Sequence, residues 1–218
     1  MLLHSFPAGS FGTNCYVLAT ASGQACVIVD PGQDAAEPLH DIVTRYRLEP
    51  EAVLLTHGHM DHTWDVLPVC RRYGVPAYIH PDDRFMLDAP ARGLPETFPQ
   101  HVLAGHPNAE PASVLPLGAD QRPLRLAGLS IVARHTAGHT PGSVVLECTV
   151  DDTLLFTGDA LLAGTLGRTD GPGGSEPVLR DALARICAPL DGSTVLLTGH
   201  GRRTTLAEER RLHPFLGG

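Results

Sequence analysis

The sequence predicts an α/β protein in which two β-sheets pack together with helices on their outer faces. In each half of the chain, β-rich runs come first and amphipathic helical runs follow, an order that favours layered sheets covered by helices. The chain has 218 residues, enough to bury a sizeable core. This length also favours one domain over two, so we expect residues 1–218 to form a single unit.

Local patterns place the elements of the first half. Two β-rich runs are separated by the turn cluster Ala-Ser-Gly-Gln, which predicts a hairpin. Apolar residues at helical spacing, and a glycine stop at Gly74, indicate the helices. The expected elements are strands over 14–20 and 25–30, a helix over 34–47, a strand over 52–56, a helix ending near Tyr73 and a strand over 76–80.

The second half repeats this plan after a proline-rich segment, 81–123, for which we expect a short helix followed by a long loop. A long segment without regular structure is usually functional or mobile. The expected elements that follow are strands over 129–134, 143–150 and 153–157, a helix over 176–187, a strand over 193–198 and a helix over 206–212.

The composition argues against two classes of partner. The formal net charge is −8, all 16 basic residues are arginines, and no basic run is present to follow a phosphate backbone. The N-terminus lacks the basic and apolar regions of a secretory signal, and no apolar stretch reaches the ~18 residues of a membrane span. We therefore expect neither a nucleic-acid partner nor a membrane.

The five cysteines are dispersed and odd in number, and they form no C-x-x-C pair. They are Cys15, Cys26, Cys70, Cys148 and Cys187. This pattern predicts reduced, mostly buried thiols in a cytoplasmic protein and gives little support to a catalytic cysteine.

The metal-ligand chemistry of the chain begins in Thr-His-Gly-His-Met-Asp-His, residues 56–62, directly after an apolar run. His57 and His59 are two apart in extended backbone and project to one side, whereas Asp61 and His62 follow as the chain turns into a helix. Imidazole and carboxylate ligands suit zinc, iron or manganese. Because the four side chains cannot all point one way, the motif indicates two metal ions. The alternative is a solvated His-rich turn.

Three more candidate ligands each follow a predicted strand and a glycine. His139 lies in Thr-Ala-Gly-His-Thr-Pro-Gly-Ser, Asp159 in Phe-Thr-Gly-Asp-Ala and His200 in Leu-Thr-Gly-His-Gly. The glycine lets the backbone approach a metal without a Cβ in the way. Each alone is typical of a cap or a surface loop, but together with residues 56–62 they predict one metal centre on one rim of the sheets.

These motifs, in this order, resemble the metallo-β-lactamase superfamily, from Thr-Asn-Cys-Tyr near the N-terminus to Glu-Arg-Arg-Leu-His-Pro-Phe-Leu near the C-terminus. Gly-Arg-Thr-Asp followed by Gly-Pro-Gly-Gly-Ser resembles the glyoxalase II-like branch, as does the ending Gly-His-Gly-Arg-Arg-Thr-Thr-Leu-Ala-Glu-Glu-Arg. The resemblance implies an αββα sandwich of two mixed sheets with two divalent metal ions, expected to be zinc, at one edge. The implied ligands are His57, His59 and His139 for one metal, Asp61, His62 and His200 for the other, and Asp159 as a bridge.

Two adjacent cations would lower the pKa of a shared water and polarise a carbonyl, so a Ser or Cys nucleophile is not needed. Asp61 and Asp159 are the expected catalytic carboxylates, and Asp61 can also accept a hydrogen bond and a proton from the water. The glyoxalase II resemblance implies a small-molecule thioester substrate such as S-lactoylglutathione.

Arg168, in Gly-Arg-Thr-Asp, occupies a position where the family has a basic residue close to the substrate. The resemblance therefore implies contact with a glutathione carboxylate, and the alternative is that Arg168 only pairs with Asp170 and holds the loop. Full-length glyoxalase II enzymes continue past the last metal histidine into a helical domain that contacts glutathione. This sequence ends at residue 218, shortly after His200, so we expect that half of the substrate site to be missing.

Some other polar residues also have expected roles. We expect His135 to be structural, and His101 or His106 to line the entrance to the site from the long loop. Asn14 and Tyr16 are expected in the core or behind the ligands.

Other functions are compatible with the same fold. A mononuclear iron persulfide dioxygenase would use His57, His139 and Asp159, although the C-terminal Gly-His-Gly with Thr-Thr and Glu favours a hydrolase. A lactone or β-lactam hydrolase is a second rival. Seven intact ligands argue against a catalytically silent binding protein, and the acidic charge argues against a nuclease.

Overall fold

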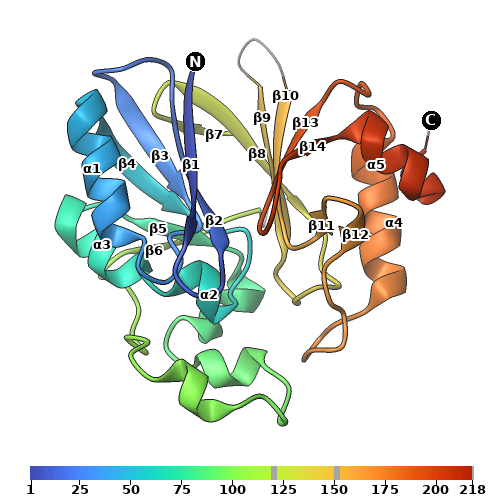
Figure 1. Ribbon diagram of the computed structural model, residues 1–218, viewed down its shortest axis with the longest axis horizontal. Helices are drawn as coiled ribbons and strands as arrows, with labels where there is room; N and C mark the ends of the chain where they lie inside the picture. Colours follow the sequence, from blue (N-terminus) through green and yellow to red (C-terminus); the bar gives the residue numbers. More distant parts are fainter. Residues whose placement is uncertain (119–121, 150–152, 218) are drawn as a thin grey trace.

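The computed structural model places two six-stranded β-sheets face to face (Figure 1). It describes residues 1–118, 122–149 and 153–217. Helices α1 (Ala36–Tyr46) and α3 (Val66–Tyr73) cover the outer side of one sheet, and helices α4 (Glu176–Cys187) and α5 (Leu206–Leu212) cover that of the other. This αββα arrangement confirms the predicted fold class.

The first sheet is mixed, and its strands are ordered as they follow in the sequence. They are β1 (Leu2–Ala8), β2 (Thr13–Ala19), β3 (Ala25–Val29), β4 (Glu49–Leu54), β5 (Ala77–Ile79) and β6 (Val114–Pro116). The antiparallel pairing of β2 with β3 confirms the predicted hairpin. From β3 to β6 the strands run parallel, because helical crossovers return the chain to the same end of the sheet.

The second sheet has the order β14-β13-β10-β9-β8-β7. Its strands are β7 (Leu124–Leu126), β8 (Leu129–His135), β9 (Val144–Thr149), β10 (Thr153–Gly158), β13 (Val195–Thr198) and β14 (Thr204–Thr205). β10 and β13 are parallel, joined through α4, and the other pairs are antiparallel. A separate ribbon of β11 (Leu161–Leu162) and β12 (Thr165–Leu166) follows β10.

The main apolar core lies between the two sheets, because alternate strand residues point to the same face. Leu18 and Leu54 of the first sheet belong to one buried cluster with Ile131 and Leu146 of the second. Two further clusters fill the spaces between each sheet and its helices. All five cysteines are buried and free, as the sequence predicts.

The helix expected after the His-rich motif is interrupted between α2 (Met60–Thr63) and α3. Asp65 explains the break. Its N–H donates to the Pro31 carbonyl (3.0 Å), and its carboxylate accepts a hydrogen bond from the Ala36 N–H at the start of α1 (2.8 Å). Both partners are distant in sequence, so helical spacing alone could not reveal them.

The expectation of a single short helix in 81–123 is wrong. The segment contains three 3₁₀ helices and strand β6. The helices are η1 (Pro81–Met86), η2 (Pro90–Gly93) and η3 (Gln100–Leu103). Residues 119–121 of the expected loop, and Val150 of the expected strand over 143–150, lie outside the described residues.

Several short or edge strands also escape the sequence patterns. β1 is an edge strand that is only partly buried and contains Pro7, so its apolar residues do not alternate clearly. The strands β7, β11, β12 and β14 have only two or three residues each. A segment this short forms a strand because a neighbouring strand pairs with it. The chain also forms a last 3₁₀ helix, η4 (Pro214–Leu216). Among the described residues, no helix is long and apolar enough to span a membrane.

Candidate metal centre

All seven predicted ligands lie together at one edge of the sandwich, on four segments that follow strands, and two of them, Asp61 and His62, lie in the short helix α2. Residues 57–62 follow β4, His139 lies between β8 and β9, Asp159 follows β10, and His200 follows β13. The sheets thus bring side chains from distant parts of the sequence to one place. Their assignment as metal ligands stays a prediction.

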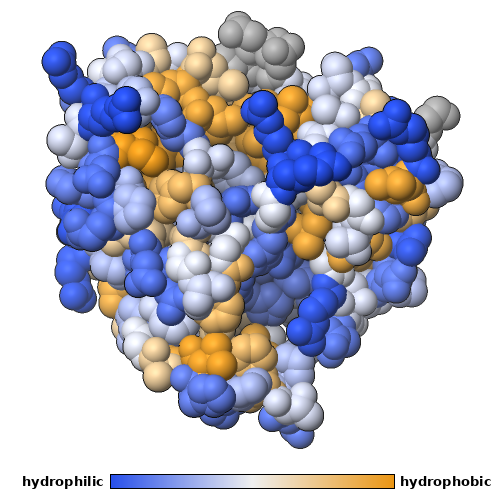
Figure 2. Space-filling model, in the orientation of Figure 1, coloured by the Kyte–Doolittle hydropathy of each residue, from blue (hydrophilic) through white to orange (hydrophobic). Residues whose placement is uncertain are grey.

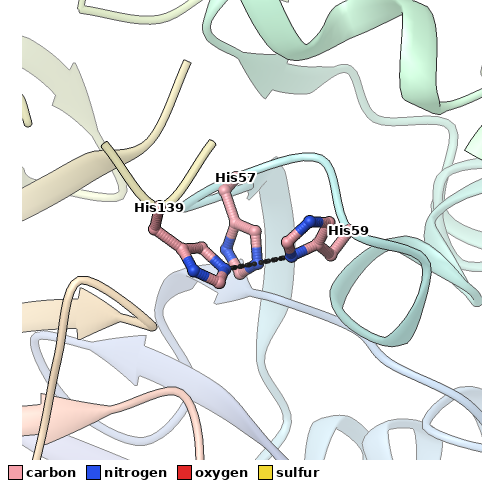
Figure 3. A group of neighbouring side chains, drawn as sticks. All are labelled: His57, His59 and His139. Atoms are coloured by element: carbon pink, nitrogen blue, oxygen red, sulfur yellow. Dashed lines mark hydrogen bonds between the residues drawn. The ribbon is translucent and has the colours of Figure 1, made fainter. Parts of the chain in front are cut away.

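Three imidazole rings, the first cluster, converge from the two sheets (Figure 3). His57 Nε2 lies 3.1 Å from His59 Nδ1 and 3.2 Å from His139 Nε2. His57 and His59 come from the loop after β4, whereas His139 comes from the loop between β8 and β9. These three nitrogens are therefore placed to bind one metal ion.

Two of these rings have their outer nitrogens hydrogen-bonded to backbone carbonyls. His59 Nε2–H donates to the Gly93 carbonyl (3.1 Å), and His139 Nδ1–H donates to the Arg168 carbonyl (2.6 Å). A carbonyl can only accept, so the proton of each neutral ring sits on its outer nitrogen. The lone pairs of His59 Nδ1 and His139 Nε2 therefore point into the cluster.

His57 is oriented through a hydroxyl and a buried carboxylate. The Thr56 hydroxyl donates to Asp30 Oδ2 (2.6 Å), so its oxygen is left to accept from His57 Nδ1–H (3.1 Å). The Nε2 lone pair of His57 then faces the other two rings. Such support behind ligating histidines is typical of metal sites.

A second cluster lies beside the first. Asp61 Oδ2 is 3.1 Å from His200 Nε2 and 3.5 Å from His62 Nε2. Asp30 accepts a hydrogen bond from His62 Nδ1–H (2.9 Å), which turns His62 Nε2 toward the cluster. Asp61 Oδ2 is held from behind by the Thr13 hydroxyl, which donates to it (2.9 Å).

Asp159 lies between the two clusters. Its Oδ1 is 3.4 Å from His62 Nε2, and its Oδ2 is 3.8 Å from His139 Nε2 and 3.6 Å from His200 Nε2. Oδ1 is buried and has no hydrogen-bond partner among the described residues. Gly199 makes this approach possible, since a Cβ there would collide with Asp159 Oδ1.

These observations fit divalent cations. Facing imidazole lone pairs repel one another unless a cation lies between them, and a buried carboxylate oxygen that accepts no hydrogen bond is free to bind one. A mixed set of imidazoles and carboxylates suits zinc, iron and manganese. The residues present therefore fit the kind of metal that the sequence predicts.

Protonation differs between the two clusters. Burial lowers the pKa of all three rings of the first cluster, that of His139 to about 4. Burial alone would also lower the pKa of His62 and His200, but the carboxylates of Asp61 and Asp159 outweigh it and raise both values. The first cluster is thus neutral near pH 7, whereas the second tends to hold protons in the metal-free protein.

We expect metal binding at the second cluster to strengthen as pH rises from 6 to 8, and binding at the first cluster to change little. A metal ion must displace protons from His62 and His200, and each displaced proton makes affinity rise about tenfold per pH unit. Competition titrations at pH 6, 7 and 8, with proton release recorded by calorimetry in two buffers, measure this. Affinities that are independent of pH at both positions would contradict the prediction.

A further group, His80, Asp82 and His135, has ligand atoms within 4.8 Å of one another. The two imidazole rings, however, are stacked, 4.1 Å apart and only 10° from parallel. Their lone pairs lie in separate ring planes and do not converge. His135 Nε2–H donates to the Pro141 carbonyl (2.8 Å), in keeping with the structural role expected for it.

Five of the seven predicted ligands form the floor of a cavity of about 440 Å³, namely His59, Asp61, His139, Asp159 and His200, whereas His57 and His62 do not line it. Its walls include apolar side chains from three segments, Phe11, Leu94, Pro95, Phe98, Leu162 and Leu166. Apolar side chains also show at the lower part of the face in Figure 2, over the 3₁₀ helices η1–η3. The segment 81–123 thus contributes a wall, but His101 and His106, expected at the entrance, are not among the lining residues.

Arg168 lines the rim of this cavity and is paired with Asp170. Its Nε and Nη2 atoms each donate to one oxygen of the Asp170 carboxylate at 2.9 Å, and both side chains are exposed. The alternative expectation of an Arg168–Asp170 pair is therefore what the structure shows. Contact with a substrate carboxylate stays a prediction.

Several supporting residues hold the ligand loops. As expected, Asn14 and Tyr16 lie behind the ligands, and both donate from their side chains to the Thr198 carbonyl (2.9 and 2.6 Å), next to the His200 loop. Asp30, which supports His62 and Thr56, was not predicted from the sequence. Its place directly after a buried strand, like that of Asp159, is the signal that could have found it.

The fold and this centre define a class of protein, an αββα sandwich with a His- and Asp-lined metal centre at one edge. The sequence profile of the metallo-beta-lactamase superfamily matches residues 8–200, and the chain belongs to this superfamily of metallo-hydrolases.

Similar proteins span nearly the whole chain. An uncharacterised protein of Mycobacterium leprae is 47% identical over 100% of both chains. The hydroxyacylglutathione hydrolase GloC of Haemophilus influenzae is 32% identical over 99% of this chain and 98% of its own length. The probable metallo-hydrolase YqgX of Bacillus subtilis is 32% identical over 97% of this chain and 96% of its own. The Haemophilus relative agrees with the predicted glyoxalase II-like branch.

Two crystal structures share the fold. The BLEG-1 B3 metallo-beta-lactamase has a TM-score of 0.84 and 32% identity, with 100% of both chains covered. TTHA1623 in a di-iron-bound form has a TM-score of 0.77 and 31% identity, covering 97% of this chain and 99% of that one.

Proposed function

We propose that the protein is a metal-dependent thioester hydrolase that uses two divalent metal ions, preferably zinc. The observation that carries this proposal is the convergence of five imidazoles and two carboxylates at one edge of the sandwich, where three of the imidazoles and both carboxylates line a cavity. The likeness to the Haemophilus hydroxyacylglutathione hydrolase supports an acyl-thiol substrate. S-Lactoylglutathione, or a related small acyl-thiol, is the proposed substrate.

Bound divalent cations would supply a water of lowered pKa and polarise the carbonyl of the substrate. Asp61 would position that water. Burial alone would raise the pKa of Asp61, but the imidazoles of His62, His200 and His59 lower it, so the carboxylate is ionised and accepts hydrogen bonds at neutral pH. The Thr13 hydroxyl holds one oxygen of Asp61 in place.

The walls of the cavity would orient the rest of the substrate. Apolar side chains such as Phe98 and Leu166 limit the access of bulk water, and they can contact the acyl chain or the thiol side of a thioester. The peptide carbonyl of Arg168 holds the His139 ring, so this residue links the rim of the cavity to its floor.

We expect Arg168→Ala to raise KM for an anionic thioester by about ten- to hundredfold and to change KM for a neutral one of similar size little. A guanidinium forms paired hydrogen bonds with a carboxylate, and a substrate carboxylate would take the place of Asp170. Steady-state kinetics on the two substrates measure the effect. Arg185→Ala removes another exposed, carboxylate-paired arginine on α4 and is the matched control. An equal rise in KM for both substrates would show that Arg168 only holds the loop.

The function is tested by three assays on one metal-analysed preparation. Thiol release from S-lactoylglutathione and simpler thioesters is expected, without oxygen uptake on glutathione persulfide and without comparable opening of lactones or β-lactams. Oxygen uptake without thioester cleavage would show that the protein is a persulfide dioxygenase and not a hydrolase. Faster turnover of lactones or β-lactams would leave the metal-dependent hydrolase in place but show that its substrates are not thioesters.

A further inference from the structure

A buried carboxylate outside both clusters connects the loops that carry the first cluster. Asp83 lies in η1 and is 0% exposed. It belongs to none of the groups of converging ligand atoms that the described residues form. A buried carboxylate is unfavourable unless it is hydrogen-bonded, so its partners indicate what it is placed for.

Within the described part of the chain, its side chain accepts three hydrogen bonds, all from the loops that carry these histidines. Asp83 Oδ2 accepts from the Gly58 N–H (2.9 Å) and from the Thr140 hydroxyl (2.6 Å). Asp83 Oδ1 accepts from the Gly142 N–H (2.6 Å). Gly58 separates the two histidines of the β4 loop, and Thr140 directly follows the histidine of the β8–β9 loop. One carboxylate thus connects two loops that belong to different sheets.

A glycine in each of the two loops leaves room for Asp83. A Cβ on Gly142 would lie 2.7 Å from Asp83 Cγ and 2.8 Å from the Asp83 nitrogen. A Cβ on Gly58 would lie 2.8 Å from the Asp83 carbonyl oxygen. Both glycines therefore allow the loops to close around Asp83.

We propose that Asp83 is a positioning residue that fixes the separation of the two loops and thereby sets the metal affinity of the first cluster. It acts through the backbone N–H groups of Gly58 and Gly142 and the hydroxyl of Thr140, and not by contact with the metal or the substrate. The inference rests on the metal binding of the proposed function. It assigns a role in metal binding to Asp83, a residue of the segment 81–123 that is not itself a predicted ligand.

The fold itself has other connections at this place. The Val144 N–H donates to the Thr56 carbonyl (2.8 Å) and joins the same two loops by backbone alone. The core between the sheets also holds them together. Asp83→Asn keeps the size of the side chain but replaces one acceptor oxygen by an NH₂ group, so at least one of the three donors loses its partner. The change should therefore loosen the loops and leave the fold in place.

The experiment compares Asp83→Asn with Asp82→Asn in the full chain. Asp82 precedes Asp83 in the same turn, and its side chain is 59% exposed, so its replacement removes the same charge without touching the loops. Zn²⁺ affinity is measured by chelator competition, the ligand geometry by Co²⁺ absorption, and the stability of the metal-free protein by thermal unfolding. We expect Asp83→Asn to weaken one of the two metal positions about ten- to hundredfold and to alter its Co²⁺ spectrum. Asp82→Asn should behave as the unaltered protein.

Thr140→Ala provides a second, milder test, because it removes one of the three donors. It should weaken the same metal position in the same direction but by less. Unchanged Zn²⁺ affinity and Co²⁺ spectrum in Asp83→Asn would overturn the proposal. If Asp83→Asn fails to fold, unchanged metal binding in Thr140→Ala would overturn it as well. Absence of metal binding by the unaltered protein would overturn this inference and the proposed function together, whereas binding without thioester cleavage would overturn only the substrate class.

Discussion

Replacing Asp159 or Asp61 by alanine is expected to lower thioester hydrolysis by at least about a thousandfold, which corresponds to about 4 kcal/mol of lost transition-state stabilisation. Asp159 lies within 3.8 Å of histidines from both clusters, so its loss affects both metal positions. Asp61 takes part in the second cluster and faces the cavity, so its loss removes a ligand and the acceptor for the water together.

The fold should survive both changes. The two carboxylates lie at the edge of the sandwich and belong to none of its apolar clusters. Activity at saturating metal, together with thermal unfolding, measures the two effects separately. Asp181→Ala, an exposed carboxylate on α4, is the control and should retain full activity. Near-normal turnover in Asp159→Ala or Asp61→Ala would show that the ligand assignment is wrong.

The second large effect is expected on metal removal. The purified protein should bind close to two transition-metal ions per chain, because seven converging side chains provide two sets of three and one bridge. A chelator should abolish hydrolysis, and readdition of Zn²⁺ should restore it. A metal at a hundred times its Kd stabilises the folded state by about 2.7 kcal/mol, so each filled site should raise Tm by roughly 5–10 °C.

Elemental analysis, equilibrium dialysis and calorimetric unfolding check this result. A stoichiometry of one, with iron only and with oxygen consumed on glutathione persulfide, would favour the dioxygenase. If Mn²⁺ or Fe²⁺, but not Zn²⁺, restored hydrolysis, the protein would still be a metal-dependent hydrolase, but its metal would not be zinc.

Much of the fold could be predicted from local patterns. The β2–β3 hairpin, α1, β4, α4 and the strands β8–β10 all follow from apolar periodicity and turn residues in the sequence itself. The break at Asp65 could not be predicted, because its partners Pro31 and Ala36 lie about thirty residues away. The edge strand β1 and the short strand β6 likewise form through pairing with a neighbour, which no local periodicity records.

The candidate site also has features that local sequence predicts and features that depend on the packing of the sheets. The residue types available as ligands, and their positions after predicted strands, can be read from the sequence, because Gly-His and Gly-Asp turns are local features. The packing of the sheets shows that they converge as two clusters with Asp159 between them, that Asp30 and Asp83 support them from behind, and that Arg168 is paired with Asp170. These features could not be read from the sequence, because a hydrogen bond or a shared metal position depends on distances of about 3 Å between loops. Those distances are set by the packing of the two sheets and not by the spacing of residues along the chain.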